Sequence, residues 1–295
     1  MKSKGSVWFR LGFMAPAVIF YFVLVLWPLL QAFQLAFYRL SGLSKKRTFV
    51  GWENFQTIFS DGVFLRALGH NLTLLIGGVA LVLIIGFPLA IAAQGDGKLA
   101  KTLRSLYLVP HVISLVVVAI LWQAIFNSQM GLLTSGMKSL GFQDIPAWMG
   151  DKRTALGTII VAFTWYALGF AIMVLQAGLK SIPQDVNEAA ELDGAQGWQR
   201  FWSIIWPLSW PTRRIVVIQT CIAALNTFAL VRLMTNGGPD RASEVTLTYL
   251  FERGFQPNSL YGEATAIAIL NFALVLVVTV GVLLLFGRHP VEGKR

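Results

Sequence analysis

The chain has 295 residues, of which 56% are apolar and only 13% are charged. This mixture excludes an ordinary soluble domain, in which about a quarter of the residues are charged, and is typical of a polytopic membrane protein. The net charge of +10 would suit nucleic-acid binding, but the basic residues are spread over short loops rather than gathered on one face. The single cysteine, Cys221, cannot form an internal disulfide, and the three histidines are too scattered to indicate a metal site.

Six apolar segments are long enough to cross a bilayer, which takes about 20 residues per helix. The first is too long for the core of a signal peptide, so we expect it to stay as a membrane anchor. The sequence therefore predicts an all-α polytopic membrane protein with six transmembrane helices. The expected spans are residues 11–37, 71–94, 105–127, 155–179, 212–234 and 264–287.

The distribution of lysine and arginine between the loops indicates the orientation of the chain. With six spans both termini lie on one side, and that side carries 13 lysines and arginines against ten in the opposite loops. Because positively charged loops tend to stay in the cytoplasm, we expect residues 1–10 and 288–295 to be cytoplasmic. The segment 38–70 is then extracytoplasmic.

Two of the extracytoplasmic stretches carry recognisable local patterns. The first, "FVGWENFQTIFSDGVFLRALGH", predicts one or two helices that lie at the membrane surface, with Trp52, Phe55 and Phe59 at membrane depth. The second follows the fifth span and opens on a Gly-Gly-Pro turn at 237–239.

The longest polar loop on the cytoplasmic side is "SIPQDVNEAAELDGAQGWQRFWSIIWPLSWP", residues 181–211. Its first part, 185–193, is predicted to be helical, and Gly194 can end that helix in the left-handed conformation that glycine favours. A stripe of mostly small side chains recurs at helical spacing, over which another backbone could approach closely. Glu188 and Glu191 lie off this stripe and are available to a cationic partner. The stripe consists of Val186, Ala189, Ala190 and Asp193.

The second part of the loop repeats the helical spacing with aromatic residues. Trp198, Phe201, Trp202 and Ile205 form a stripe that needs to be buried, and two prolines then turn the chain back toward the bilayer. The pattern predicts a folded platform rather than an extended linker.

Simpler interpretations of the loop are open from these residues alone. Asp185 could cap the first helix while Glu188 reaches back to its amide, as in a capping box. The aromatic stripe could merely lie on the membrane surface. Neither interpretation requires a partner.

The spacing within the loop resembles that of a known family. Glu-Ala-Ala at 188–190, Gly194, Ile204 and Trp206-Pro207 are spaced as in the EAA loop of bacterial ABC-transporter permeases, where the last pair is usually Leu-Pro. The segments "YLVPHVISLVVVAILWQAIFN", "LKSIPQDVNEAAELDGA" and "LMTNGGPDRASEVTLTYLFERGF" resemble the carbohydrate-uptake branch, specifically the maltose and glycerol-3-phosphate type of permease. The resemblance extends from about residue 49 to residue 287.

The resemblance implies a type I ABC importer permease fold in a bacterial or archaeal cell (inner) membrane, with its core at 71–287. It also implies partners: a second homologous permease subunit, two ATP-binding cassette ATPase subunits and an extracytoplasmic solute-binding protein. ATP and Mg would be bound by the ATPases, since this chain has no GxxxxGK[ST] phosphate loop. The chain itself would need no cofactor and would not be an enzyme.

The EAA helix of such permeases docks into a groove on one ATPase and acts as a lever. Carried over to this chain, the resemblance implies that Glu188 pairs with a basic residue of that groove and that Gly194 permits the tight bend. The implied coupling residues are Glu188, Ala189, Ala190, Asp193 and Gly194.

A solute path needs hydrogen-bonding groups at membrane depth, where polar residues are otherwise costly. The third, fourth and fifth spans offer such groups, and the resemblance implies that solute contacts come from the same three spans. Bonding between helices would explain several of them equally well. The candidates are His111, Ser114, Trp165, Tyr166, Gln219, Ala223, Asn226 and Thr227.

The function expected from these observations is that of a pore-forming subunit that imports a sugar or a related polyol. The same scaffold could instead import a glycerophosphodiester, a polyamine or another non-sugar solute. A membrane-embedded enzyme is disfavoured because the spans contain almost no carboxylates, and a channel is disfavoured because no filter sequence is present.

Overall fold

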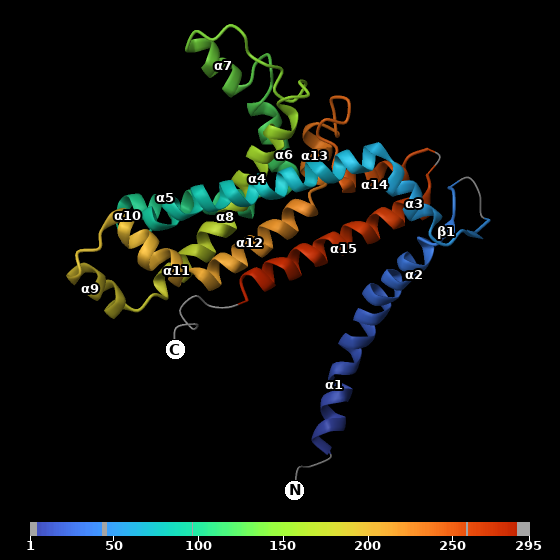
Figure 1. Cartoon of the computed structure of the whole chain (residues 1–295), viewed down its shortest axis with the longest axis horizontal. Helices are drawn as coiled ribbons and strands as arrows, with labels where there is room; N and C mark the ends of the chain where they lie inside the picture. The colour runs from blue at the N-terminus through green and yellow to red at the C-terminus, as the bar shows by residue number, and fades with distance from the viewer. Residues whose placement is uncertain (1–4, 43–45, 96, 258, 288–295) are drawn as a thin grey trace. The chain divides into compact units, whose positions relative to one another are not determined.

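The computed structural model is predominantly helical (Figure 1) and describes residues 5–42, 46–95, 97–257 and 259–287. Four continuous helices in these ranges have the length and apolar composition needed to cross a membrane, and they coincide with the first, second, fourth and sixth predicted spans. The predicted tail at 288–295 and the first four residues of the predicted N-terminal segment lie outside the described residues. The four helices cover Gly12–Leu35, Gly62–Ala92 (α4), Ala155–Lys180 (α8) and Tyr261–Leu285 (α15).

The first of these helices is apolar on every side. It comprises α1 (Gly5–Tyr21), a π-helical turn η1 (Phe22–Leu26) and α2 (Trp27–Leu35), and none of its most apolar stretch is buried within the chain. A helix that is apolar all round without a protein neighbour belongs in lipid. This agrees with the expected membrane anchor.

The third predicted span is broken into two helices. α5 (Lys98–Val112) ends two residues after Pro110, and α6 (Leu115–Ile125) continues at an angle of 106°. The Ser114 hydroxyl accepts a hydrogen bond from the Val116 amide at 3.4 Å and so caps α6, a preferred role for serine. The bend therefore has a local sequence cause.

The fifth predicted span is also broken, between α12 (Trp210–Leu225) and α13 (Ala229–Met234). The side chains of Asn226 and Thr227 each donate to the carbonyl four residues earlier, at 2.9 Å, and bonds of this kind compete with the helical backbone. The prediction of six transmembrane helices is not confirmed. Among the described residues, the four continuous helices and the bent pair α5–α6 give at most five candidate spans.

The chain clusters into two compact units, residues 1–62 with 250–270 and residues 63–249 with 271–295. The first unit contains a short antiparallel hairpin that no sequence pattern indicated. It also contains one helix from the segment that was predicted to lie at the membrane surface, whereas the second half of that segment is the start of α4. The elements are β1 (Tyr38–Arg39), β2 (Thr48–Phe49) and α3 (Glu53–Ser60).

Asn54 is the polar centre of the first unit. Its side chain is 6% exposed and donates to the carbonyls of Ala36 and Tyr38 at 2.7 and 3.0 Å. The rings of Phe37 and Phe55 pack against each other with their centroids 5.5 Å apart. The Asn54 side chain therefore connects α3 to the segment that follows α2. This contact explains why a polar residue occupies a buried position within "GWENF".

The two ends of the first unit are joined by a three-membered ion cluster. The Arg253 guanidinium lies 2.8 Å from Asp61 and 3.3 Å from Glu263. All three side chains are less than one-third exposed, so solvent screens this cluster less than an ordinary surface pair.

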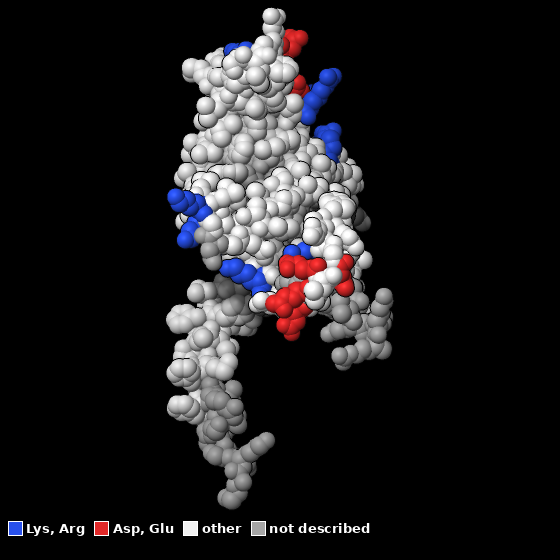
Figure 2. Space-filling view, turned by 90° about the vertical axis from the view of Figure 1, so that its left-hand side faces the viewer, with Lys and Arg blue, Asp and Glu red and all other residues white. Residues whose placement is uncertain are grey.

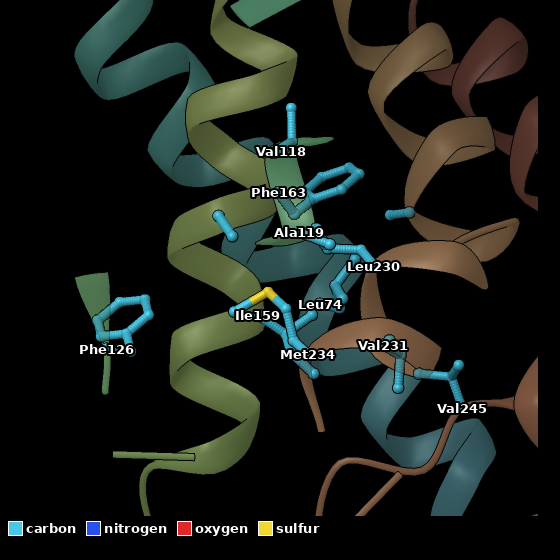
Figure 3. Close-up of a cluster of buried hydrophobic side chains, with 12 residues drawn as sticks. Leu74, Val118, Ala119, Phe126, Ile159, Phe163, Leu230, Val231, Met234 and Val245 are labelled. Carbon is cyan, nitrogen blue, oxygen red and sulfur yellow. The ribbon is translucent and has the colours of Figure 1, made fainter. Parts of the chain in front are cut away.

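The second unit has two buried apolar clusters. In the first, side chains of α4, α6, α8 and α13 meet, and Figure 3 shows Leu74, Ile159, Leu230 and Met234 lying close together. In the second, α4 packs on α8 and α12 through Phe87, Leu175, Val216 and their neighbours. Helix α8 contributes to both clusters and is thus the central element of this unit.

Polar side chains also join the helices of the second unit. Asn71 of α4 accepts a hydrogen bond from the Thr246 amide at 2.8 Å, and the Thr246 hydroxyl donates to Asn271 of α15 at 3.0 Å. These residues are buried and out of reach of water. Their polar groups therefore need hydrogen-bond partners within the protein, which these bonds provide. Thr246 begins α14 (Thr246–Phe255).

The Gly-Gly-Pro segment forms a compact loop around a buried acid. Glu244 is 5% exposed and lies 3.6 Å from Arg241, and its carbonyl contacts the Nδ1 of His70 at 2.8 Å. Gly237 has φ +80° and no room for a side chain, since a Cβ there would lie 2.6 Å from the Glu244 carboxylate. Glycine is therefore required at this turn.

The remaining helices are short. They are α7 (Leu132–Ser139), α9 (Gln184–Leu192), α10 (Gly197–Arg200), the π-helical turn η2 (Phe201–Ile205) and α11 (Trp206–Leu208).

Replacing Asn54 with alanine should loosen the first unit. The substitution removes two hydrogen bonds and leaves two carbonyls without their donor, a loss of about 1–3 kcal/mol. We expect faster tryptic cleavage at the exposed Arg47 of the purified protein. The control is Gln56→Ala, at an exposed position of the same helix. Equal cleavage rates in the two variants would contradict this role for Asn54.

Candidate functional site

The polar loop folds as predicted into a short helix followed by an aromatic arm. α9 begins at Gln184, one residue before the predicted start, and ends at Leu192. Its N-cap is Pro183, and no side chain caps the helix. The suggested capping box is therefore absent, and Glu188 instead accepts a hydrogen bond from the Gln184 side chain at 2.8 Å.

Gly194 ends α9 in the predicted left-handed conformation, with φ +73°. The Ala195 amide donates to the Ala190 carbonyl at 2.9 Å, and the Gly194 amide donates to the Glu191 carbonyl at 3.1 Å. This pair of bonds is the Schellman arrangement, which satisfies carbonyls at the helix end. The turn fixes the direction in which the chain leaves α9.

The predicted stripe of small side chains is divided between the inside and the outside of the fold. Ala190 is 4% exposed and Val186 is half-buried, whereas Ala189 and Asp193 are exposed. The stripe is therefore not a continuous outer face, because its Val186 and Ala190 part packs inward. Only the other part can contact a partner.

The outer surface of α9 is acidic with an apolar tip. Asp185, Glu188, Glu191 and Asp193 are all exposed, and Leu192 is 90% exposed. Figure 2 shows acidic side chains gathered in one patch on the face that carries α9. Leu192 was not singled out from the sequence, since helical spacing alone does not show that it points away from the fold.

The aromatic arm is only partly buried. Phe201 packs edge-on against Phe87 of α4 with centroids 5.6 Å apart, and Trp206 contacts the same ring at 5.4 Å. Trp198 remains 75% exposed and Trp202 45% exposed. The prediction that the stripe is buried holds for its Phe201 side and is wrong for the two tryptophans.

Arg213 anchors the arm to α12. Its guanidinium lies 3.8 Å from the Trp206 ring and 5.1 Å from the Trp210 ring, and it donates to the Trp206 carbonyl at 2.7 Å. A buried cation between two tryptophan rings is a favourable cation–π arrangement. The Trp210 indole in turn donates to the Phe286 carbonyl at the end of α15 at 3.1 Å.

The loop and the arm are also joined by a surface ion pair. Glu191 of α9 lies 3.6 Å from Arg200 of α10. Exposed pairs of this kind contribute little to stability, so the turn at Gly194 and the ring packing hold α9 in place.

Two of the candidate solute residues, His111 and Tyr166, lie near each other at the crossing of α5 and α8. The His111 ring lies 5.9 Å from Tyr166 and 5.6 Å from Phe170, and the two helices approach closely at Gly169. His111 is exposed within this chain. An exposed imidazole flanked by aromatic faces can bind a polar solute by hydrogen bonding and stacking.

The remaining candidates are divided between exposed and buried positions. Asn226 and Gln219 are exposed, whereas Thr227 is 4% exposed and bonded to its own helix. Trp165 and Ala223 pack against the first apolar cluster. Thr227 therefore shapes the break between α12 and α13, while Asn226 both shapes the break and presents its side chain outward.

Asn226 is itself positioned by a partner that sequence reasoning missed. The Asn271 side chain donates to the Asn226 side-chain oxygen at 3.3 Å. These two residues are 45 positions apart, so no local pattern links them.

Comparisons with known proteins show the family of the chain. Residues 82–289 match the family described as "Binding-protein-dependent transport system inner membrane component". The chain belongs to this family. As a component of a transport system in the inner membrane, it is a transport protein with several apolar helices.

Several characterised or named relatives align over most of the chain. The probable ABC transporter permease protein YurN of Bacillus subtilis is 31% identical, with 96% of each chain covered. The sn-glycerol-3-phosphate transport system permease protein UgpA of Brucella abortus is 31% identical, with 90% of each chain covered. The diacetylchitobiose uptake system permease protein NgcF of Streptomyces coelicolor is 31% identical, covering 98% of this chain and 86% of its own.

The fold also matches a solved structure. A chain of a bacterial ABC transporter involved in the import of the acidic polysaccharide alginate superposes with a TM-score of 0.79, at 24% identity and with 96% of each chain covered. The chain therefore shares the helical fold of a chain of that transporter.

Gly194→Ala should loosen the end of α9. A side chain in the left-handed conformation costs about 1–2 kcal/mol, which corresponds to an increase of roughly 5- to 30-fold in the local open population. We expect hydrogen exchange at the backbone amides of residues 194 and 195 to accelerate by this factor.

The matched control is Gln196→Ala, two residues further along at extended backbone with φ −121°. It should leave the exchange rates unchanged. Slow exchange in the Gly194 variant would show that the turn tolerates a side chain.

Proposed function

We propose that the chain is one of two pore-forming subunits of an ATP-driven importer, and that α9 transmits the movement of an ATPase subunit to the spans. The observation that carries this proposal is the position of α9. It is an exposed acidic helix whose exit is fixed by Gly194 and whose supporting arm is locked to α4 and α12. A lever needs this combination of an open contact surface and a rigid attachment.

The acidic surface of α9 indicates that its partner carries basic residues. Glu188 is exposed and makes its one described side-chain bond to Gln184 of the same helix, so a basic residue of an ATPase groove can pair with it. Leu192 supplies an apolar contact at the end of the helix. ATP and Mg would be held by that partner, and this chain would contribute no catalytic group.

The proposed topology counts each broken helix pair as one crossing. α5 with α6 and α12 with α13 then complete six crossings, and both termini lie in the cytoplasm together with α9. The arginine and lysine distribution supports this orientation. The extracytoplasmic partner is a solute-binding protein, as the family description implies.

The proposed solute is a sugar or a related polyol. The candidate polar groups on the spans are uncharged amides, hydroxyls and one imidazole beside aromatic rings, a combination that suits carbohydrate hydroxyls and faces. The named uptake of diacetylchitobiose by a relative supports this class.

A phosphorylated polyol is the second candidate, because another relative is named for sn-glycerol-3-phosphate transport. Such a solute favours a cationic group in its path. Arg213, the buried cation of α12, is engaged by Trp206 and Trp210, so the candidate residues favour the uncharged solute.

Reversing the charge at Glu188 should uncouple the ATPase. Glu188→Lys places a cation against the proposed basic groove, and breaking an interfacial charge pair costs about 2–5 kcal/mol. We expect the ATPase subunits to be lost from the affinity-purified complex and ATP-driven uptake to fall with them.

The control for this experiment is Gln199→Lys, which adds a cation at an exposed position of the same loop on α10. It should retain both the ATPase subunits and transport. If the Glu188 variant behaves like this control, the coupling role of α9 is wrong.

Uptake competition should identify the solute class. In cells that express the complete transporter, we expect labelled oligosaccharide uptake to be competed by unlabelled mono- or oligosaccharides and not by excess sn-glycerol 3-phosphate or putrescine. Competition by the phosphate ester or the polyamine alone would favour the alternative class.

A further inference from the structure

The second unit contains an apolar groove that the proposed transport path does not use. It has a volume of about 500 Å³ and lies between α6, α7 and the start of α8. Its lining is almost wholly apolar, with the rings of Trp122, Phe126 and Trp148 on one side and Gly157 and Val161 of α8 on the other.

The composition of the groove excludes the transported solute. A sugar carries several hydroxyl groups, each of which loses free energy when it is buried without a hydrogen-bond partner. The groove offers almost no polar surface to compensate that loss. Its occupant is therefore largely apolar.

One cation lies at the mouth of the groove. Arg153 lines the groove, is exposed, and directly precedes the apolar helix α8. The neighbouring Lys152 is neutralised by Asp240, whose carboxylate lies 2.5 Å from the ammonium and has its pKa lowered by that hydrogen bond. No described residue pairs with the Arg153 guanidinium, so its charge remains available to an anion.

The groove extends inward from this cation along α8. Val161 follows Arg153 by eight positions, which corresponds to about 12 Å along a helix. The Trp122 ring lines the groove. A cation therefore lies at the mouth of an apolar channel.

We propose that this groove binds one phospholipid molecule. Its phosphate contacts Arg153, and an acyl chain fills the space along Gly157 and Val161. The order of these groups with depth is that of a phospholipid in a bilayer leaflet. A helix of a neighbouring subunit would match the apolar wall but would leave the cation at the mouth without an anion.

Gly157 allows the groove to be filled without disturbing the fold. A Cβ atom at this position meets nothing within 4 Å, so Gly157→Leu places its side chain in the open groove. Gly281→Leu is the matched control, because Gly281 of α15 also has nothing within 4 Å of an added Cβ and does not line the groove. Arg153→Gln removes the charge at the mouth and leaves the apolar wall intact.

The test uses the full-length chain in the complex in which it purifies, reconstituted in nanodiscs with a phosphatidylglycerol that carries a diazirine on one acyl chain. We expect photolysis to label the peptides that contain Trp122 and Val161. Gly157→Leu should reduce this labelling to the background of the unirradiated sample, and Gly281→Leu should label like the unmodified protein. Arg153→Gln should weaken labelling by about fivefold, the contribution of one basic residue near an anionic lipid surface.

Two results would overturn the proposal. One is labelling of the groove peptides that is equal in all variants, which would indicate bulk lipid contact. The other is the absence of groove labelling together with cross-linking of Val161→Cys to a neighbouring subunit, which would show that protein covers the groove.

Discussion

The structure of the second unit depends on satisfying backbone polar groups where no water is present. A continuous helix achieves this by itself, and a broken helix needs substitutes from side chains or neighbours. Ser114 supplies an acceptor at the start of α6, and the Asn71 side chain donates to the Ala224 carbonyl near the end of α12 at 3.4 Å. Both breaks are therefore stabilised by specific polar residues, and the same residues determine where polar groups face the outside of the spans.

The need for these side-chain hydrogen bonds explains which parts of the fold could be predicted from the sequence. Helices α4, α8 and α15 were predicted because a long apolar run is a local signal that needs no partner. The breaks after Val112 and Leu225 were not predicted, since apolar runs continue through them. The bond between Asn71 and Thr246 joins residues 175 positions apart, and no periodicity indicates such a pairing.

The polar loop shows the same division between local and long-range information. The helix and its glycine stop were predictable because the Schellman turn depends on the backbone preference of one residue. The role of Arg213 was not, because it depends on two tryptophan rings brought together by the fold. Burial of Ala190 likewise depends on what lies behind α9, and so the sequence suggested a wider contact surface than the structure offers.

The attachment of the loop explains how a short helix is held in a fixed position. α9 has only nine residues, fewer than an isolated helix needs to be stable in water. Its inner side packs through Ala190, and the arm behind it is held by ring contacts to Phe87 and by the cation between Trp206 and Trp210. In the proposed coupling, displacement of α9 would be passed to α4 and α12 instead of being absorbed by the loop.

The acidic patch on α9 has a consequence for the unassembled chain. In the proposed orientation it faces a cytoplasmic leaflet whose lipids give the membrane a negative surface potential. This potential attracts Arg200 and Arg214 at the base of the loop and repels the carboxylates of Glu188 and Glu191. The repulsion acts over about one Debye length, roughly 8–10 Å in physiological salt. In the proposed orientation, this electrostatic repulsion keeps α9 away from the lipid surface before a partner binds.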